Sequence, residues 1–218
     1  MPLFFHGHEQ RALGNIQSTI ALFAREDVQA VIVDCATCGS ALRTEYARVL
    51  ANLGHSPDRT LGLADKVWDV TEFVAQDLEA LQERMPRQGE QSPLRVTYHS
   101  PCHLRNTQKC SAQIADFLHA LPGVEYVQAA DWERCCGGGG TFFYEYPEIT
   151  RHMVSRKIEN AQVTGAELWL TGCPGCRMNL SGNMPDQGGL AVKHPIEVVA
   201  RLLHEDTAGM PLSPSKTR

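Results

Sequence analysis

The chain has 218 residues, of which 43% are hydrophobic, and a formal net charge of −5. That length is enough to bury an ordinary core, and the mild acidity argues against nucleic acid as a partner. No apolar run approaches the ~18 residues of a membrane span and no signal peptide opens the chain, so we expect a cytoplasmic protein. In that compartment clustered cysteines bind metal more often than they form disulfides.

The first part of the chain predicts helices around one short strand. Residues 9–25 carry an apolar stripe typical of an amphipathic helix, and residues 30–33 read Ala-Val-Ile-Val, typical of a buried parallel strand. Cys35 and Cys38 form a Cys-x-x-Cys motif directly after that strand. The motif opens a second helix, and Gly54 is placed to end it.

The next stretch predicts a boundary between two units. We expect a loop over residues 55–63 and, from apolar spacing, a helix over residues 67–82. Two prolines and a glycine in residues 83–93 indicate a linker. The chain therefore divides into a first unit at 1–82 and a second unit at 94–205.

The second unit alternates strands with amphipathic helices, which predicts a parallel sheet with helices on both faces. The residues that follow it, 206–218, have the composition of a flexible tail. The expected strands lie at 94–98, 124–127, 168–170 and 190–192, and the expected helices at 111–121, at 147–165 and from Pro195.

Five of the eight cysteines follow strands of this second unit. Between the first of them and the adjacent pair lie 32 residues, and between the pair and the last two, a Cys-x-x-Cys, lie 36. Because parallel strands end at the same edge of a sheet, we expect the five thiols to converge there. They are Cys102, Cys135, Cys136, Cys173 and Cys176.

Five converging thiols favour an iron–sulfur cluster. Thiolates are soft ligands, and a structural zinc ion takes only four. Adjacent cysteines can serve different iron atoms of one cluster, whereas they crowd a tetrahedral zinc ion. Gly137 and Gly138 follow the pair, and their backbone amides can approach sulfur closely. A [4Fe–4S] cluster, cubane or non-cubane, is therefore the preferred cofactor, with zinc as the alternative.

The order Cys102…Cys135-Cys136-Gly137…Cys173-x-x-Cys176 resembles the cysteine-rich CCG domain. This family includes the cysteine-rich subunit of heterodisulfide reductase and the iron–sulfur subunits of glycolate, lactate and anaerobic glycerol-3-phosphate oxidoreductases. Its members usually carry two such domains in tandem. The strand and Cys-x-x-Cys at Cys35 and Cys38 match those at Cys173 and Cys176, so the resemblance extends over nearly the whole chain.

The resemblance implies an α/β fold with two related units, each a small parallel sheet flanked by helices, the first one incomplete. Counting about 35 residues back from Cys35 puts the first Cys-Cys-Gly before Met1. The chain thus resembles an N-terminally truncated family member. It also lacks the ferredoxin-type cysteine runs of longer relatives.

The resemblance further implies an electron-transfer subunit of a flavin-linked 2-hydroxy-acid oxidoreductase of the glycolate or lactate type. Its partners would be a flavin-containing dehydrogenase subunit, since no G-x-G-x-x-G follows a strand here, and a ferredoxin-type iron–sulfur protein. It would meet membranes only through partners. Two alternatives stay open: disulfide chemistry at the cluster, as in heterodisulfide reductase, and a zinc-binding or structural interaction module.

The remaining candidate residues each allow more than one interpretation. Cys35 and Cys38 suit half of a cluster site, a redox-active thiol pair or two packed thiols, and we expect the half-site. We expect Cys110 to be a buried packing residue. For His103 and His194, capping or loop roles are expected over contact with sulfur.

Overall fold

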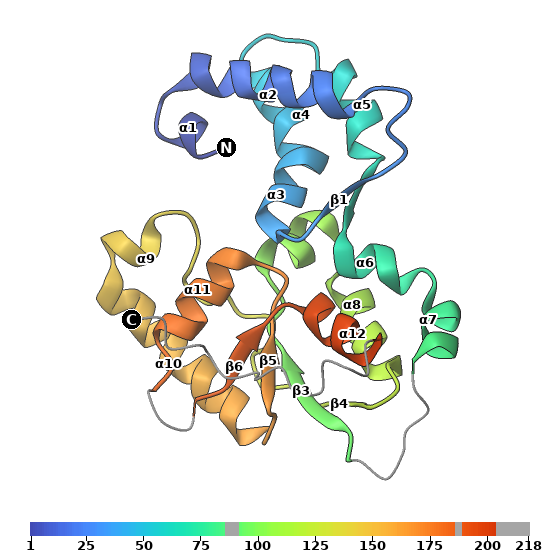
Figure 1. The fold of residues 1–218 in the computed structure, drawn as a ribbon. Helices are drawn as coiled ribbons and strands as arrows, with labels where there is room; N and C mark the ends of the chain where they lie inside the picture. The colour runs from blue at the N-terminus through green and yellow to red at the C-terminus, as the bar shows by residue number, and fades with distance from the viewer. Residues whose placement is uncertain (86–91, 186–188, 204–218) are drawn as a thin grey trace, which may run out of the picture.

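The structure, a computed structural model, describes residues 1–85, 92–185 and 189–203 and contains two parallel β-sheets (Figure 1). The smaller sheet pairs β1 (Val31–Val33) with β2 (Val67–Asp69). The larger sheet has the strand order β4-β3-β5-β6, with every pair parallel. Its strands are β3 (Leu94–Tyr98), β4 (Val124–Tyr126), β5 (Leu168–Leu170) and β6 (Ala191–Lys193). The predicted fold class, α/β with two helix-flanked parallel sheets, is confirmed.

Helices around the smaller sheet form the upper body in Figure 1. They are α1 (Pro2–Phe5), α2 (Glu9–Phe23), α3 (Ala36–Ser40), the π-helical turn η1 (Ala41–Glu45), α4 (Tyr46–Asn52) and α5 (Asp58–Ala64). The predicted stripe of α2 supplies Leu13, Ile16 and Ile20 to a core that also contains Val49 and Leu63. As predicted, Gly54 follows the end of the helix after Cys38, directly beyond its C-cap Leu53, with a φ of 75° that favours glycine.

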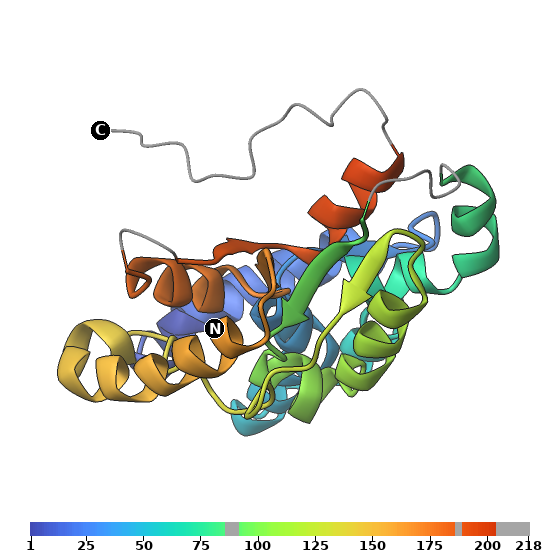
Figure 2. The same cartoon turned by 90° about the horizontal axis from the view of Figure 1, so that it is seen from below.

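Helices cover both faces of the larger sheet (Figures 1 and 2). On one face lie α8 (Ser111–Ala120) and α12 (Pro195–Leu203), and on the other lie α10 (Pro147–Val163) and α11 (Pro174–Gly182). The sheet between them is buried on both sides, and Tyr98, Leu168 and Trp169 are among its fully buried side chains. This is the arrangement that alternating strands and amphipathic helices predict.

Two predictions for the middle of the chain are wrong. The expected helix over 67–82 begins instead with β2, and then forms α6 (Val70–Ala75) and α7 (Leu78–Arg84). The strand forms because Val67 pairs with Val31, a partner far away in sequence that local periodicity cannot reveal. Asp69 then starts α6 with a capping box that includes Glu72. The expected loop over 55–63 contains α5.

The two bodies are in direct contact. Val74 of α6 and Leu78 of α7 pack against the core of the larger sheet, although they precede its first strand. At the carboxyl edge of the sheets, the backbone N–H of Ala36 donates to the carbonyl of Gly172 at 2.9 Å. This hydrogen bond brings the start of α3 beside the start of α11.

Parts of the predicted organisation lie outside the described residues. They are most of the expected linker (residues 86–91) and the expected tail at 206–218. Among the helices that the structure describes, none has the length and apolar character needed to cross a membrane.

Candidate metal centre

The five cysteines of the second unit meet at the carboxyl edge of the larger sheet. Cys102 follows β3, the adjacent pair follows β4, and Cys173 caps the N-terminus of α11 directly after β5. Their side chains form one series of neighbouring thiols, Cys102–Cys135–Cys136–Cys176–Cys173, in which each thiol shifts the pKa of the next. The convergence expected from their spacing is therefore present, while their role as ligands stays a prediction.

The pKa values of these five thiols are shifted in different directions. Hydrogen bonds from Cys102 and Cys136 lower the pKa of Cys135 to about 2, and a hydrogen bond from Cys176 lowers the pKa of Cys173 to about 5. Hydrogen bonding to their neighbours and burial raise the pKa of the other three thiols. The pKa of Cys102 and that of Cys176 are raised well above the usual range, and the pKa of Cys136 is raised to about 11. Metals bind thiolates, so binding a metal at these thiols would release protons.

The loop after the pair directs amides at sulfur, as predicted for Gly137 and Gly138. The N–H of Gly137 lies 3.3 Å from the Cys135 Sγ, and that of Gly138 lies 3.4 Å from the Cys136 Sγ. Gly137 has a φ of 82°. The side-chain amide of Asn179 on α11 donates to the Cys136 carbonyl at 2.7 Å and holds the loop against that helix.

Cys35 and Cys38 lie next to this series of thiols rather than within it. Cys35 caps α3, and its Sγ accepts a hydrogen bond from the backbone N–H of Cys38 at 3.3 Å. Burial chiefly raises the pKa of Cys35 to about 12, and the negative charge of Cys173 adds to the increase. The hydroxyl of Thr37 lies 3.6 Å from the Cys173 Sγ and links the two motifs.

Sequence reasoning missed two buried polar residues at this site. His99 is 1% exposed, burial lowers its pKa to about 3, and one of its ring nitrogens lies within 4.8 Å of the sulfurs of Cys136 and Cys176. Lys157 is 4% exposed, and burial lowers its pKa to about 8. A signal existed for each. His99 comes directly after β3, and Lys157 lies three residues after Val154 on the buried face of α10.

Three other candidates have mainly structural surroundings. Cys110 is buried in the core, as predicted. The Nδ1 of His194 accepts a hydrogen bond from the N–H of Ile196 at the start of α12, which confirms a capping role. His103 lies on the surface of the site, with its Nδ1 at 3.8 Å from the Cys102 Sγ and 3.3 Å from the Thr37 hydroxyl.

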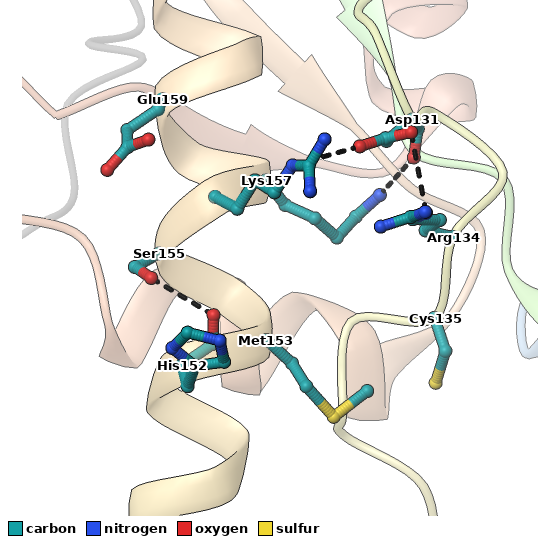
Figure 3. A pocket seen from close by; sticks show the side chains of 9 residues that line it. Asp131, Arg134, Cys135, His152, Met153, Ser155, Lys157 and Glu159 are labelled. Carbon is teal, nitrogen blue, oxygen red and sulfur yellow. Dashed lines mark hydrogen bonds and ion pairs between the residues drawn. The ribbon is translucent and has the colours of Figure 1, made fainter.

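An open pocket of about 590 Å³ gives access to this site from the side of α10 (Figure 3). Cys135, the exposed member of the series of thiols, lies on the loop that faces Met153 of the helix. Asp131 accepts ion pairs from Arg134 and Arg156, at 3.4 Å and 3.3 Å. The pocket therefore offers a ligand one thiol, the thioether of Met153, three cationic side chains and two acidic ones.

The donor set fits an iron–sulfur cluster better than a zinc ion. All five donors are sulfur, they come from three loops of the sheet, and backbone amides are aimed at two of them. Zinc would use only four of these thiols. Residues 96–181, which include all five of these cysteines, match the family model of the cysteine-rich domain called CCG.

Similar proteins include lactate utilization proteins and a reductase subunit. The chain is 29% identical over 199 residues to "Lactate utilization protein A" of Shouchella clausii, an alignment that covers 91% of this chain and 80% of that protein. A protein of the same name from Bacillus subtilis is 26% identical over 199 residues, again 91% of this chain and 80% of that protein. A subunit of "Fumarate reductase (CoM/CoB)" of Methanothermobacter marburgensis is 28% identical over 165 residues, 76% of this chain and 30% of that protein.

Proposed function

We propose that this chain is an iron–sulfur electron-transfer subunit of a flavin-linked 2-hydroxy-acid oxidoreductase, of the lactate or glycolate type. The observation that carries the proposal is the meeting of five neighbouring thiols at one sheet edge. The similarity to lactate utilization proteins over 91% of the chain supports the substrate class. Hydride chemistry on the acid would belong to a separate flavin subunit, and a ferredoxin-type protein would be a further partner.

When bound, a [4Fe–4S] cluster would accept and pass on single electrons. The chain's own residues hold and tune it. Cys102, Cys135, Cys136, Cys173 and Cys176 would be the ligands. The N–H groups of Gly137 and Gly138 would stabilise anionic sulfur, which favours the reduced, more negative state. The buried surroundings of three of the five sulfurs exclude water from most of the centre.

Anaerobic purification from the native host tests this proposal. A tagged chain should copurify with flavin, iron and acid-labile sulfide, and an electron paramagnetic resonance signal should appear when lactate or glycolate is added. A chain that carries zinc and no iron under these conditions would contradict the iron–sulfur assignment. An iron centre that dithionite reduces, but neither 2-hydroxy acid does, would contradict the assignment to this substrate class.

A second candidate function is disulfide reduction at the cluster. The specific observation in its favour is that Cys135 is exposed and lines the open pocket of Figure 3, which Arg134, Arg156 and Lys157 also line. Small anionic thiols or disulfides would reach the centre from that side. The similarity to a subunit of fumarate reductase (CoM/CoB) agrees with such chemistry. An altered paramagnetic signal of the oxidised centre on addition of a small thiol, with no response to 2-hydroxy acids, would favour this function.

A further inference from the structure

His99 occupies the interior side of the five-cysteine site. It is the first residue after β3, and its backbone N–H donates to the carbonyl of Leu170 on the neighbouring strand at 2.8 Å. Its ring packs edge-on against Trp169, with the ring centroids 6.5 Å apart. Backbone and ring are thus both held in place, and the imidazole is shielded from solvent, since the residue is 1% exposed.

The ring nitrogens of His99 lack the partners that a buried imidazole needs. Neither Nδ1 nor Nε2 makes a full hydrogen bond within the described residues. A buried polar group without a partner is costly and uncommon in native proteins. One of these nitrogens, however, lies with the Sγ atoms of Cys136 and Cys176 in a group whose atoms are all within 4.8 Å of one another. Three donors at such separations are arranged as ligands around one metal atom.

The surroundings of the ring also favour a lone pair on the side of the sulfurs. The backbone carbonyl of Trp132 is near enough to attract an N–H of the His99 ring, although without full hydrogen-bond geometry. The same carbonyl accepts the N–H of Ser100 at 3.1 Å. A neutral imidazole that directs its N–H at a carbonyl has a lone pair on the other nitrogen. Histidines that bind metals commonly have this arrangement, in which a backbone carbonyl fixes the tautomer and the orientation.

We propose that His99 would supply a nitrogen ligand to the iron centre, beside the sulfurs of Cys136 and Cys176. This inference rests on the proposed iron–sulfur function and adds to it a mixed nitrogen and sulfur coordination. A hydrogen bond from His99 to a thiolate is the alternative use of that nitrogen, and the strength of the nitrogen coupling distinguishes it from a ligand bond. If His99 had only a structural role, both of its ring nitrogens would lack a hydrogen-bond partner.

A nitrogen ligand changes the properties of the centre in a predictable direction. Imidazole is neutral, whereas thiolate is anionic, so an iron atom with histidine in place of cysteine is easier to reduce. We therefore expect the centre to have a higher reduction potential than an all-cysteine centre in the same pocket. His99→Cys should lower the midpoint potential, and His99→Gln should remove the nitrogen ligand without adding a charge.

Pulsed electron paramagnetic resonance on the anaerobically purified protein tests the proposal. The reduced centre should show a strong nitrogen coupling that changes when the protein is labelled with ¹⁵N-histidine and that disappears in His99→Gln. His103→Gln is the matched control: its ring lies 3.8 Å from the Cys102 Sγ, yet the coupling should persist. The midpoint potential of His99→Cys, measured by redox titration, should lie below that of the wild-type protein.

Each result of this experiment has a distinct meaning. If the wild-type protein contains iron and sulfide but shows no strong histidine coupling, the ligand assignment is overturned and the proposed function is left intact. The same holds for a coupling that survives in His99→Gln or is lost in His103→Gln. Absence of iron and sulfide from the wild-type protein would instead contradict the proposed function itself, before the ligand question arises.

Discussion

The two Cys-x-x-Cys motifs of this chain have nearly the same backbone and very different surroundings. Cys35 caps α3 with φ −135° and ψ 111°, and Cys173 caps α11 with φ −136° and ψ 118°. Both follow a parallel strand. Around Cys173 the sheet brings together four more thiols, whereas Cys38 is exposed to solvent. A strand, a motif and a helix therefore build the same local structure twice, and the neighbouring strands decide which copy becomes a complete site.

The largest expected effect comes from replacing one cysteine of the five-thiol series, and a cysteine of the first Cys-x-x-Cys motif provides the comparison. Cys136→Ser should reduce bound iron and sulfide at least about tenfold, because even loss of residues that only support ligands costs 10–100-fold in metal affinity. Cys38→Ser should leave the iron content unchanged, since Cys38 lies outside the series of five thiols. Iron and sulfide analysis after anaerobic purification measures both. Equal loss in the two variants would show that both motifs serve one centre.

A smaller effect is expected from crowding the loop that carries the cysteine pair. A Cβ at Gly138 would lie 2.9 Å from the carbonyl oxygen of Gly175 and 3.0 Å from the Asn179 Cβ. Because a backbone atom cannot easily move aside, Gly138→Ala should cost about 1–3 kcal/mol of unfolding free energy. Gly139→Ala is the control, with no atom within 4 Å of its Cβ. Urea unfolding of both variants measures the difference, and equal stabilities would contradict this account.

At the end of β2, the smaller sheet has a buried carboxyl group where the larger sheet has thiols. Asp69 is fully buried at the start of α6, where its Oδ1 accepts from the N–H groups of Thr71 and Glu72. Burial raises its pKa from 3.8 to about 6. The folded state therefore binds a proton more tightly than the unfolded state, so this group lowers stability as pH rises from about 4 to about 6, by about 3 kcal/mol in all.

Asp69→Asn should remove that part of the pH dependence while it keeps the cap. Urea unfolding of the metal-free proteins between about pH 4 and about pH 7.5 should show the variant gaining on the wild type as pH rises. The titratable groups that face Asp69 are Glu72, Tyr98 and Cys110, and they are present in both proteins. A stability difference that is constant across this range would show that the carboxyl group titrates normally.

The smallest effect concerns the contact between the two motifs. Thr37→Val removes the hydroxyl that lies 3.6 Å from the Cys173 Sγ and keeps the shape of the side chain. Loss of one such hydrogen bond is worth about 0.5–1.5 kcal/mol. If the hydroxyl stabilises anionic sulfur in the assembled centre, the midpoint potential should fall by a few tens of millivolts. An unchanged potential in a redox titration would show that the motifs are independent.

Local pattern determined most of the secondary structure but failed where pairing is distant. The strands at Val31–Val33 and Leu168–Leu170 are short apolar runs, and such a run is consistent with a buried strand. The strand at Val67–Asp69 continues into a helix, so its residues share the apolar spacing of that helix. Only its pairing with β1 makes it a strand, and no local window contains that information.

The sequence by itself determined which sulfurs belong together, because parallel strands all end at one edge and the spacing of the cysteines matches strand and helix units. Only the tertiary structure revealed His99 as their neighbour, Lys157 as a buried cation and the contact of Thr37 with Cys173. The physical reason is that the direction of a side chain across a sheet edge depends on packing between elements, which spacing along the chain does not record.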